Sequence, residues 1–178
     1  EGERGHGGED VVCAETGAFW QEGEASACTD DDHEHQRFEV HHHRSLVTMP
    51  DGTAVMAVSF DAADPYTRDE PPAFGLYLDD RWSPPWPHIH IDWPDFGAPD
   101  DPDVVVAEVA GLLDRARNDE LVEIGCLGAH GRTGTALAVA AVLCGVAPTD
   151  AVDWVRVNYC DRAIETPEQE AFVLSCAG

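Results

Sequence analysis

Residues 126 to 134 contain a cysteine and an arginine separated by five residues, in the order Cys-Leu-Gly-Ala-His-Gly-Arg-Thr-Gly. Five residues allow the backbone to turn into a cradle whose N–H groups point inward, where an anion can bind. Gly128, Gly131 and Gly134 relieve the steric limits on such a turn. This spacing is what a phosphate-binding loop with a cysteine nucleophile requires.

Apolar segments flank this loop on both sides. Residues 121–125 form a short apolar run typical of a buried strand, and residues 133–146 are rich in Ala, Leu and Val with a helical pattern. We therefore expect the loop to lie at a helix N-terminus, where free N–H groups and the helix dipole favour negative charge. The same field is expected to lower the pKa of Cys126 below the free-thiol value of about 8.5.

The loop resembles the active-site loop of the protein tyrosine phosphatase superfamily, whose signature is Cys-x5-Arg-Ser/Thr. Residues 88–99, His-Ile-His-Ile-Asp-Trp-Pro-Asp-Phe-Gly-Ala-Pro, are similar to the strand and mobile WPD acid loop of tyrosine-specific members. Residues 162–172, Arg-Ala-Ile-Glu-Thr-Pro-Glu-Gln-Glu-Ala-Phe, resemble the family's late loop, which positions water. Because the three motifs follow the family's order, the chain is identified as a compact, dual-specificity-sized prokaryotic member.

The resemblance implies a role for each matching residue. Cys126 is expected to attack phosphorus and form a phosphocysteine, and Arg132 to hold two phosphate oxygens bidentately. Asp95 is expected to protonate the leaving oxygen and then to act as general base on water. Thr133 would donate its hydroxyl to the sulfur, and Gln169 would position the water. The phosphate would be bound, without a metal or other cofactor, by Leu127, Gly128, Ala129, His130, Gly131 and Arg132.

Three positions depart from the family's pattern. Gly125 stands where the family usually has a histidine, so a side chain that helps to order the loop is absent. Ala129 stands where many members have glycine, which predicts a small rearrangement of the cradle. Glu165 replaces the first glutamine of the late loop, and water positioning is therefore assigned to Gln169.

We expect a phosphatase that hydrolyses phosphomonoesters, with protein phosphotyrosine as the favoured substrate. The Trp-Pro-Asp loop favours phosphotyrosine, whereas the short chain favours a shallower pocket and broader specificity. One alternative is a catalytically weak or inactive module that binds phosphorylated partners. Gly125 and Glu165, which depart from the family's pattern, favour this alternative. A further alternative is a phosphatase acting on a non-protein phosphate such as a nucleotide or an inositol phosphate.

The charge of the chain limits its partners. The 178 residues carry a formal net charge of -25, and all 10 basic residues are arginine. Such a field disfavours binding to nucleic acid or to anionic lipid. It favours a halophilic origin, where high salt screens the self-repulsion, although a GC-rich genome with an acidic tail is another explanation. No apolar run approaches the roughly 20 residues of a membrane span and no signal peptide is visible, so a cytoplasmic location is expected.

The chain is expected to divide near residue 44. Residues 1–44 are rich in Glu, Asp, Gly and His, which predicts an acidic, poorly structured tail. Cys13, Cys28 and the tail histidines offer zinc ligands, or a disulfide between the two cysteines, but the close CxxC pair of a strong zinc signal is absent. Residues 45–178 are expected to form the phosphatase-like catalytic domain.

Within that domain we predict a central mixed, mostly parallel sheet flanked by helices. Strands are expected at residues 45–49, 53–60, 74–78, 86–91 and 121–125, the first two forming a hairpin around Pro50-Asp51-Gly52. Helices are expected at 102–117, from 133, from 149 to about 159, and from Pro167. Hydrogen bonding is expected for His88 and His90, and apolar packing for Cys144, Cys160 and Cys176.

Overall fold

The computed structural model describes residues 10–12, 19–21, 43–61 and 63–176, and the chain divides into two units, Glu1–His41 and His42–Gly178. In the first unit β1 (Asp10–Val12) pairs antiparallel with β2 (Phe19–Gln21), so the tail expected to be poorly structured contains a short sheet. Cys13 and Cys28, for which a zinc site or a disulfide was considered, lie outside the described residues. His43 and Arg44 belong to the second unit rather than to the tail.

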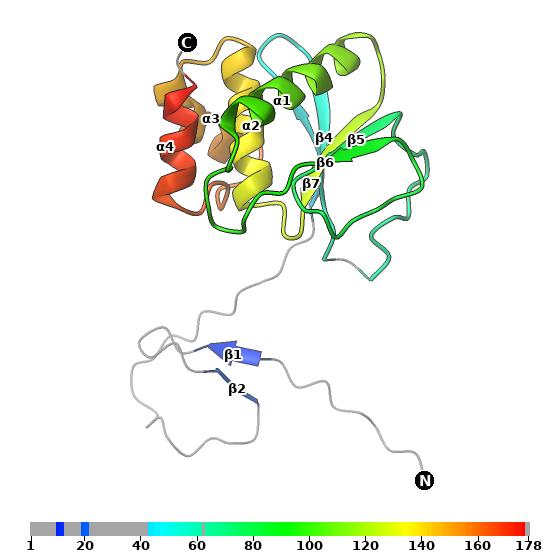
Figure 1. The fold of residues 1–178 in the computed structure, drawn as a ribbon, viewed down its shortest axis with the longest axis vertical. Helices are drawn as coiled ribbons and strands as arrows, with labels where there is room; N and C mark the ends of the chain where they lie inside the picture. The colour runs from blue at the N-terminus through cyan, green and yellow to red at the C-terminus, as the bar shows by residue number, and fades with distance from the viewer. Residues whose placement is uncertain (1–9, 13–18, 22–42, 62, 177–178) are drawn as a thin grey trace. The chain divides into compact units, whose positions relative to one another are not determined.

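The second unit is built on a five-stranded sheet with the order β3-β4-β7-β5-β6 (Figure 1). Its strands are β3 (Arg44–Thr48), β4 (Ala54–Ser59), β5 (Phe74–Tyr77), β6 (His88–His90) and β7 (Val122–Cys126). β3 and β4 form the expected antiparallel hairpin, and the other neighbours pair in parallel. The prediction of a mixed, mostly parallel sheet is therefore confirmed.

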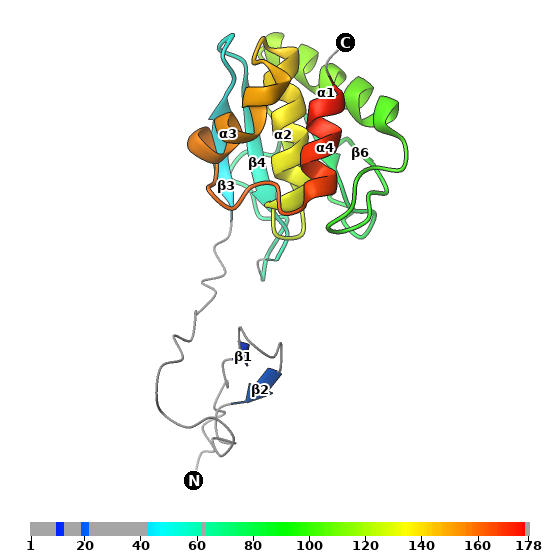
Figure 2. The same cartoon turned by 90° about the vertical axis from the view of Figure 1, so that its left-hand side faces the viewer.

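Four helices gather on one face of this sheet (Figures 1 and 2). They are α1 (Pro102–Arg117), α2 (Gly131–Leu143), α3 (Pro148–Asn158) and α4 (Pro167–Ser175). The bounds of α1 agree with the prediction because the Asp101 side chain accepts the Val104 N–H at a standard N-cap. No helix in the described part of the chain is long and apolar enough to cross a membrane.

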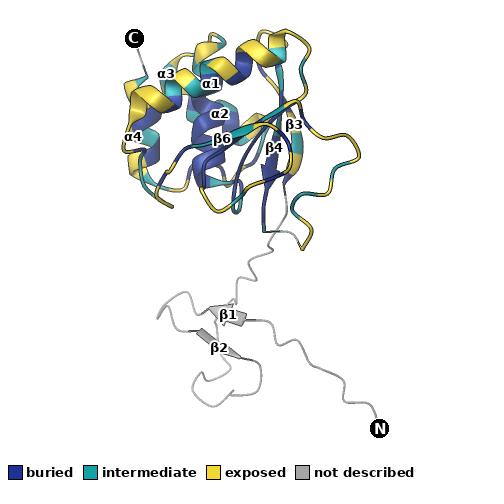
Figure 3. Ribbon diagram, turned by 45° about the vertical axis from the view of Figure 1, so that its right-hand side comes forward, coloured by how far each residue is buried: buried dark blue, intermediate teal, exposed yellow. Residues whose placement is uncertain are grey.

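α2 lies at the centre of the helical layer, and Figure 3 shows it almost wholly buried. Its small side chains let the neighbouring chain approach closely: a Cβ atom added at Gly134 would lie 2.8 Å from the Cβ atom of Ala163. α2 begins at Gly131, two residues before the expected start, because the preceding loop runs directly into the helix. The loop is therefore anchored to the most buried helix of the fold.

Aromatic side chains from loops, rather than helices, cover the opposite face of the sheet. A buried cluster there is formed by Val58, Phe60, Tyr77 and Trp86. Under it, the buried Glu123 carboxylate accepts hydrogen bonds from Tyr77 at 2.6 Å and from Arg68 Nε at 3.0 Å. These partners satisfy a charge whose burial would otherwise be costly.

The two histidines of β6 make hydrogen bonds within this region, as predicted. His88 Nδ1 lies 2.7 Å from the carbonyl oxygen of Trp86, and His90 Nε2 contacts the carbonyl oxygen of Trp82. These two contacts hold the segment between β5 and β6 in place. The chain then runs through β6 into the predicted acid loop.

Candidate active site

The candidate nucleophile lies where the central strand meets the central helix. β7 pairs in parallel with β4 on one side and β5 on the other, and it ends at Cys126. α2 begins five residues later at Gly131. Ligand sites in such sheets lie beyond the carboxyl ends of parallel strands, next to helix N-termini. The tertiary structure thus puts the Cys-x5-Arg loop in the place where an anion can bind.

Cys126 is buried, with a hydroxyl beside its sulfur. The Oγ1 of Thr133 donates to Cys126 Sγ at 3.0 Å, which is the contact expected from the sequence. Burial raises the pKa of the Cys126 thiol, although the Thr133 hydroxyl, the backbone of Thr133 and Ala129, and the charge of Arg132 act in the opposite direction. The predicted lowering of this pKa is therefore wrong, because the loss of solvation destabilises the thiolate more than these hydrogen bonds and the charge of Arg132 stabilise it.

Arg132 is held from one side and leaves the other side of its guanidinium open to a ligand. Its NH1 group donates to the carbonyl oxygens of Leu78 and Trp93, both at 3.0 Å, and lies 3.2 Å from Asp79 Oδ2. Its NH2 group lies 3.4 Å from Asp95 Oδ1. Its Nε is buried without a hydrogen-bond partner in the described part of the protein. A bidentate acceptor would therefore use Nε together with NH2, taking the place of Asp95 on NH2.

Trp93 anchors the predicted acid loop to the body of the protein. Only 1% of its surface is exposed, and its Nε1 donates to the Gly97 carbonyl oxygen at 2.8 Å. Its ring meets the ring of Phe172 in α4 edge to face, with 5.8 Å between centroids. These contacts hold the loop tightly bent, so that the residue two positions after Trp93 reaches the nucleophile.

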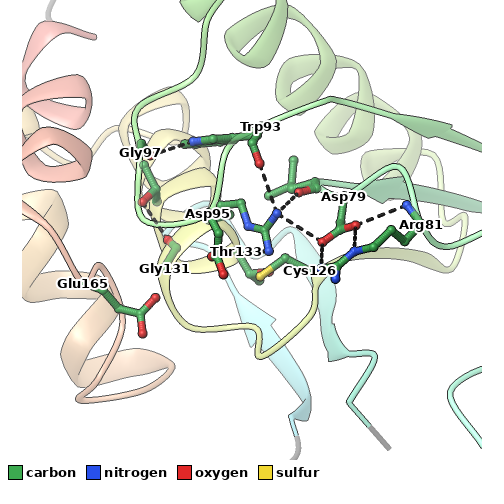
Figure 4. Close-up of polar contacts among 12 residues, drawn as sticks. Asp79, Arg81, Trp93, Asp95, Gly97, Cys126, Gly131, Thr133 and Glu165 are labelled. Atoms are coloured by element: carbon green, nitrogen blue, oxygen red, sulfur yellow. Dashed lines mark hydrogen bonds and ion pairs between the residues drawn. The ribbon is translucent and has the colours of Figure 1, made fainter. Parts of the chain in front are cut away.

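That residue is Asp95, the predicted general acid. Its side chain is half exposed and forms the ion pair with Arg132. The next residue, Phe96, has a positive φ of 60°, and its carbonyl oxygen accepts a hydrogen bond from Thr166 Oγ1 at 2.8 Å. Figure 4 shows Asp95 close to Cys126 and Thr133, with Glu165 reaching toward them from the segment before α4.

A single pocket of about 220 Å³ joins these groups. Arg132 does not line it but touches Asp95 at its edge, and Ala129 is fully buried behind it. The remaining four residues of the predicted phosphate-binding set do line it. The full lining consists of Asp61, Asp95, Phe96, Cys126, Leu127, Gly128, His130, Gly131 and Glu165.

The structure explains two of the departures from the family's pattern. A Cβ atom at Gly125 would lie 2.5 Å from the carbonyl oxygen of Val58, so the close approach of β4 excludes any larger residue. Ala129 has a φ of 57°, the left-handed conformation that glycine favours. The predicted rearrangement of the cradle is therefore not needed, since Ala129 adopts the conformation that a glycine would take. The Tyr159 hydroxyl donates to the Ala129 carbonyl oxygen at 2.6 Å and supports it.

The late loop places Glu165, rather than Gln169, in the pocket wall. The Glu165 carboxylate accepts a hydrogen bond from the backbone N–H of Gly131, while burial and the nearby Asp95 raise its pKa. Gln169 is fully buried, and its Oε1 accepts the backbone N–H of Glu165 at 2.8 Å. Gln169 thus lies behind Glu165, and its role in positioning water stays a prediction.

Sequence reasoning missed Asp79, which is buried beside the active-site arginine. It pairs with Arg132, and hydrogen bonds from Arg81, one of them at 2.7 Å, hold the pKa of Asp79 below its ordinary value. The available signal was its position two residues after β5, at the edge of the sheet where the parallel strands end. No pattern of residue types around it marks it as part of a site.

Comparison with solved structures identifies the architecture. The chain superimposes on Tk-PTP in its active form with a TM-score of 0.57 and 24% sequence identity, over 68% of this chain and 90% of that one. It superimposes on human DUSP28 with a TM-score of 0.60 and 12% identity, over 74% of this chain and 94% of that one. The structural neighbours are tyrosine and dual-specificity phosphatases, and they confirm the fold class inferred from the sequence.

Comparison of sequences gives nearer relatives. No family model matches the chain. Two proteins of Methanocaldococcus jannaschii named as uncharacterized, MJ0215 and MJECL20, are 35% and 36% identical to it over 111 residues. The matched segment is 56% of this chain and covers 67% and 72% of the two relatives. The chain belongs to one family with these archaeal proteins. This family therefore has the protein tyrosine phosphatase fold.

Proposed function

We propose that the protein is a cysteine-dependent phosphatase that hydrolyses phosphomonoesters, with protein phosphotyrosine as the favoured substrate. The observation that carries the proposal is that two separate segments, the Cys-x5-Arg loop and the acid loop, bring Cys126 and Asp95 into one pocket, with Arg132 paired to Asp95 at its edge. A nucleophile and an acid in one small cavity, with a guanidinium at its edge, are the groups that phosphoryl transfer to a thiolate needs.

In the first step the Cys126 thiol gives its proton to an oxygen of the bound phosphate dianion, and Sγ attacks phosphorus as the phosphorus–oxygen bond to the leaving group breaks. Arg132 binds two phosphate oxygens through NH2 and Nε, while its NH1 stays on the carbonyl oxygens of Leu78 and Trp93. A buried donor without a partner costs about 1–3 kcal/mol, so a phosphate oxygen on Nε recovers energy that the empty site lacks. Asp95 transfers its proton to the leaving oxygen.

In the second step water attacks the phosphocysteine and the thiolate leaves. The Thr133 hydroxyl, already 3.0 Å from the sulfur, stabilises the returning negative charge. Asp95, now deprotonated, accepts a proton from the water. Glu165 lies in the pocket wall, where its carboxylate would accept a hydrogen bond from this water, and Gln169 fixes the backbone of Glu165 from behind.

The pocket rim favours an aryl phosphate over a highly charged small molecule. Phe96, next to the acid, is 56% exposed and offers an aromatic face to a phenyl ring. Asp61, Asp95 and Glu165 also line the pocket, and their negative charge disfavours nucleotides or inositol polyphosphates, which carry several phosphates. This charge pattern supports phosphotyrosine and argues against the non-protein phosphate alternative.

The proposal is tested by hydrolysis of para-nitrophenyl phosphate and of a phosphotyrosine peptide, each at low and high salt. The wild type should show vanadate-sensitive turnover, and Cys126→Ser should abolish it. Asp95→Asn should lower the rate on the peptide by about 10²- to 10⁴-fold, and less on para-nitrophenyl phosphate, whose leaving group needs little protonation. Asp92→Asn, an exposed carboxylate of the same segment that does not line the pocket, is the matched control and should keep its rate.

A wild type with no more hydrolysis than Cys126→Ser at either salt concentration contradicts the proposal. If such a protein still binds the phosphotyrosine peptide, and Arg132→Ala loses that binding, the binding-module hypothesis replaces it. In that case Glu165, which occupies a backbone donor of the loop, is the first candidate cause of inactivity.

A further inference from the structure

Three side chains of the kinds that bind zinc gather behind the phosphate loop. They are His43 at the start of β3, His130 within the loop, and Cys160 just after α3. The Nε2 atoms of His43 and His130 are 3.2 Å apart, and all three ligand atoms lie within 4.8 Å of one another. His43 and Cys160 are 8% and 7% exposed. The cluster comes from three distant parts of the sequence.

The spacing of these atoms suits a tetrahedral ion. With zinc–nitrogen bonds of about 2.0–2.1 Å, two imidazole nitrogens on one zinc ion are about 3.3 Å apart, and a nitrogen and a thiolate sulfur are about 3.6 Å apart. The measured nitrogen–nitrogen distance of 3.2 Å is close to that value. The nitrogen–sulfur distances, at most 4.8 Å, need to shorten by at most about 1.2 Å, which a change of side-chain rotamer supplies.

We propose that His43, His130 and Cys160 bind Zn²⁺, with water in the fourth position. When the ion enters, the Cys160 S–H bond breaks, the sulfur–zinc bond forms, and the proton passes to solvent. Both imidazoles bind through Nε2 and keep their remaining proton on Nδ1. Zinc neither gains nor loses electrons, so no redox partner is required.

The surroundings of the cluster agree with an enclosed site. The Tyr159 ring packs 4.9 Å from the ring of His43, while its hydroxyl bonds to the loop at Ala129. An ion here would tie His130, and with it the phosphate loop, to β3 and to the end of α3. Gly125 offers no side chain for that purpose.

The test is a titration of the full-length protein with Co²⁺, which takes the place of zinc and shows a charge-transfer band when bound by a thiolate. One equivalent should bind with this band and with the d–d bands of a tetrahedral ion. Cys160→Ser should lose the charge-transfer band, and His43→Gln should weaken cobalt binding at least tenfold. Cys176→Ser, a partly buried cysteine outside the cluster, is the matched control and should behave as the wild type.

Cys126 and the two tail cysteines could also bind cobalt as thiolates, and further variants distinguish them from Cys160. Cys126→Ser should keep the band, and so should the double variant Cys13→Ser and Cys28→Ser. The proposal is overturned if the charge-transfer band survives in Cys160→Ser, or if it disappears in Cys126→Ser or in the double variant of the tail cysteines. The absence of any such band in the wild type also overturns it.

Further measurements distinguish the loss of metal binding from a failure of the variant to fold. Circular dichroism shows whether Cys160→Ser is folded. If it is not folded, the cobalt affinity of His43→Gln decides whether the site exists. Zinc should also raise the unfolding temperature of the wild type and of Cys176→Ser but not of His43→Gln, because only an intact site binds the folded state selectively. An equal rise in all three proteins contradicts the site. Hydrolysis enters none of these readouts, so the outcome is independent of the proposed phosphatase activity.

Discussion

The guanidinium of Arg132 shows how single contacts prepare the pocket. Two backbone carbonyls and the buried Asp79 fix NH1, so this long side chain has little conformational freedom left to lose when a ligand binds. The conformational entropy of the Arg132 side chain is therefore lost when the protein folds, and little is left to lose on ligand binding. On the facing side, Glu165 and Asp95 place negative charge near the site where the phosphate would bind.

Glu165→Gln should strengthen the binding of sulfate at neutral pH by about threefold to tenfold, because it removes one repelling charge from the pocket wall. The pKa of Glu165 is raised above its usual 4.5, first by burial and then by Asp95. As the pH falls through that raised pKa, the wild-type carboxylate becomes neutral and the two proteins should bind sulfate equally. Calorimetric titration with sulfate, which stays a dianion over this range, measures both effects.

The control for this comparison is Glu168→Gln, an exposed glutamate of the same segment that does not line the pocket. It should leave sulfate affinity unchanged at every pH. A Glu165→Gln difference that persists unchanged at acidic pH would show that the effect comes from packing rather than from charge.

At the scale of elements, α4 and the acid loop share a residue. Thr166 caps α4 by accepting the backbone N–H of Gln169 at 3.3 Å, and the same hydroxyl donates to the carbonyl oxygen of Phe96 at 2.8 Å. Phe172 of α4 packs on Trp93 of the loop as well. The position of the proposed acid, Asp95, therefore depends on a helix that carries none of the three proposed catalytic groups.

Thr166→Ala should lower the free energy of unfolding by about 1 kcal/mol through the lost cap. It should also lower kcat for a phosphotyrosine peptide, because the acid loop loses its contact with α4. Thr166→Ser keeps the hydroxyl and should restore both properties. Urea unfolding and steady-state kinetics measure the two effects.

Asp101→Ala removes a cap of the same kind from α1 and should cost a similar free energy without changing kcat. If Thr166→Ala and Asp101→Ala change stability alike and neither alters kcat, the link between α4 and the acid loop has no catalytic consequence.

At the scale of the whole molecule, acidic residues outnumber basic ones by a wide margin. The chain has 35 Asp and Glu residues against 10 Arg. Several arginines are committed to ion pairs, including Arg68 with Glu123 and Arg117 with Asp51. The remaining carboxylates repel one another across the surface, and this repulsion opposes the compact state.

The unfolding temperature should therefore rise by several degrees as KCl increases from about 0.01 M to about 0.15 M, where the Debye length falls from about 30 Å to about 8 Å. Exposed ion pairs weaken over the same range, but they contribute little to stability, so the net change should be an increase. Thermal unfolding followed by circular dichroism measures it. A flat response in this range, with a rise only in molar salt, would point to water-exclusion effects of the salt instead.

The sequence predicted best where the determining interactions are local. The start of α1 follows from an acidic cap with proline at the first helical position, and the turn at Pro50-Asp51-Gly52 follows from the positive φ that Gly52 adopts. The Cys-x5-Arg loop is likewise a short segment whose spacing and glycines reveal its chemistry. Such features depend on residues within a few positions of one another.

Other properties were missed or wrong because they depend on residues far apart in the chain. The pKa of Cys126 is raised by the burial that surrounding elements impose. Asp79 becomes a partner of Arg132 only when β5 pairs beside β7. The place of Glu165 in the pocket wall depends on how the segment before α4 packs against the phosphate loop.

By itself the sequence determined the phosphatase-type fold and the local form of the Cys-x5-Arg and Trp-Pro-Asp loops, because local turn and helix preferences and residue spacing specify them. Only the tertiary structure decided how Asp95 meets Arg132, why Gly125 admits no side chain, and that His43, His130 and Cys160 come together. The physical reason is that solvent exclusion, close approach and metal-ligand geometry arise from distances between segments, which exist only once the chain has packed.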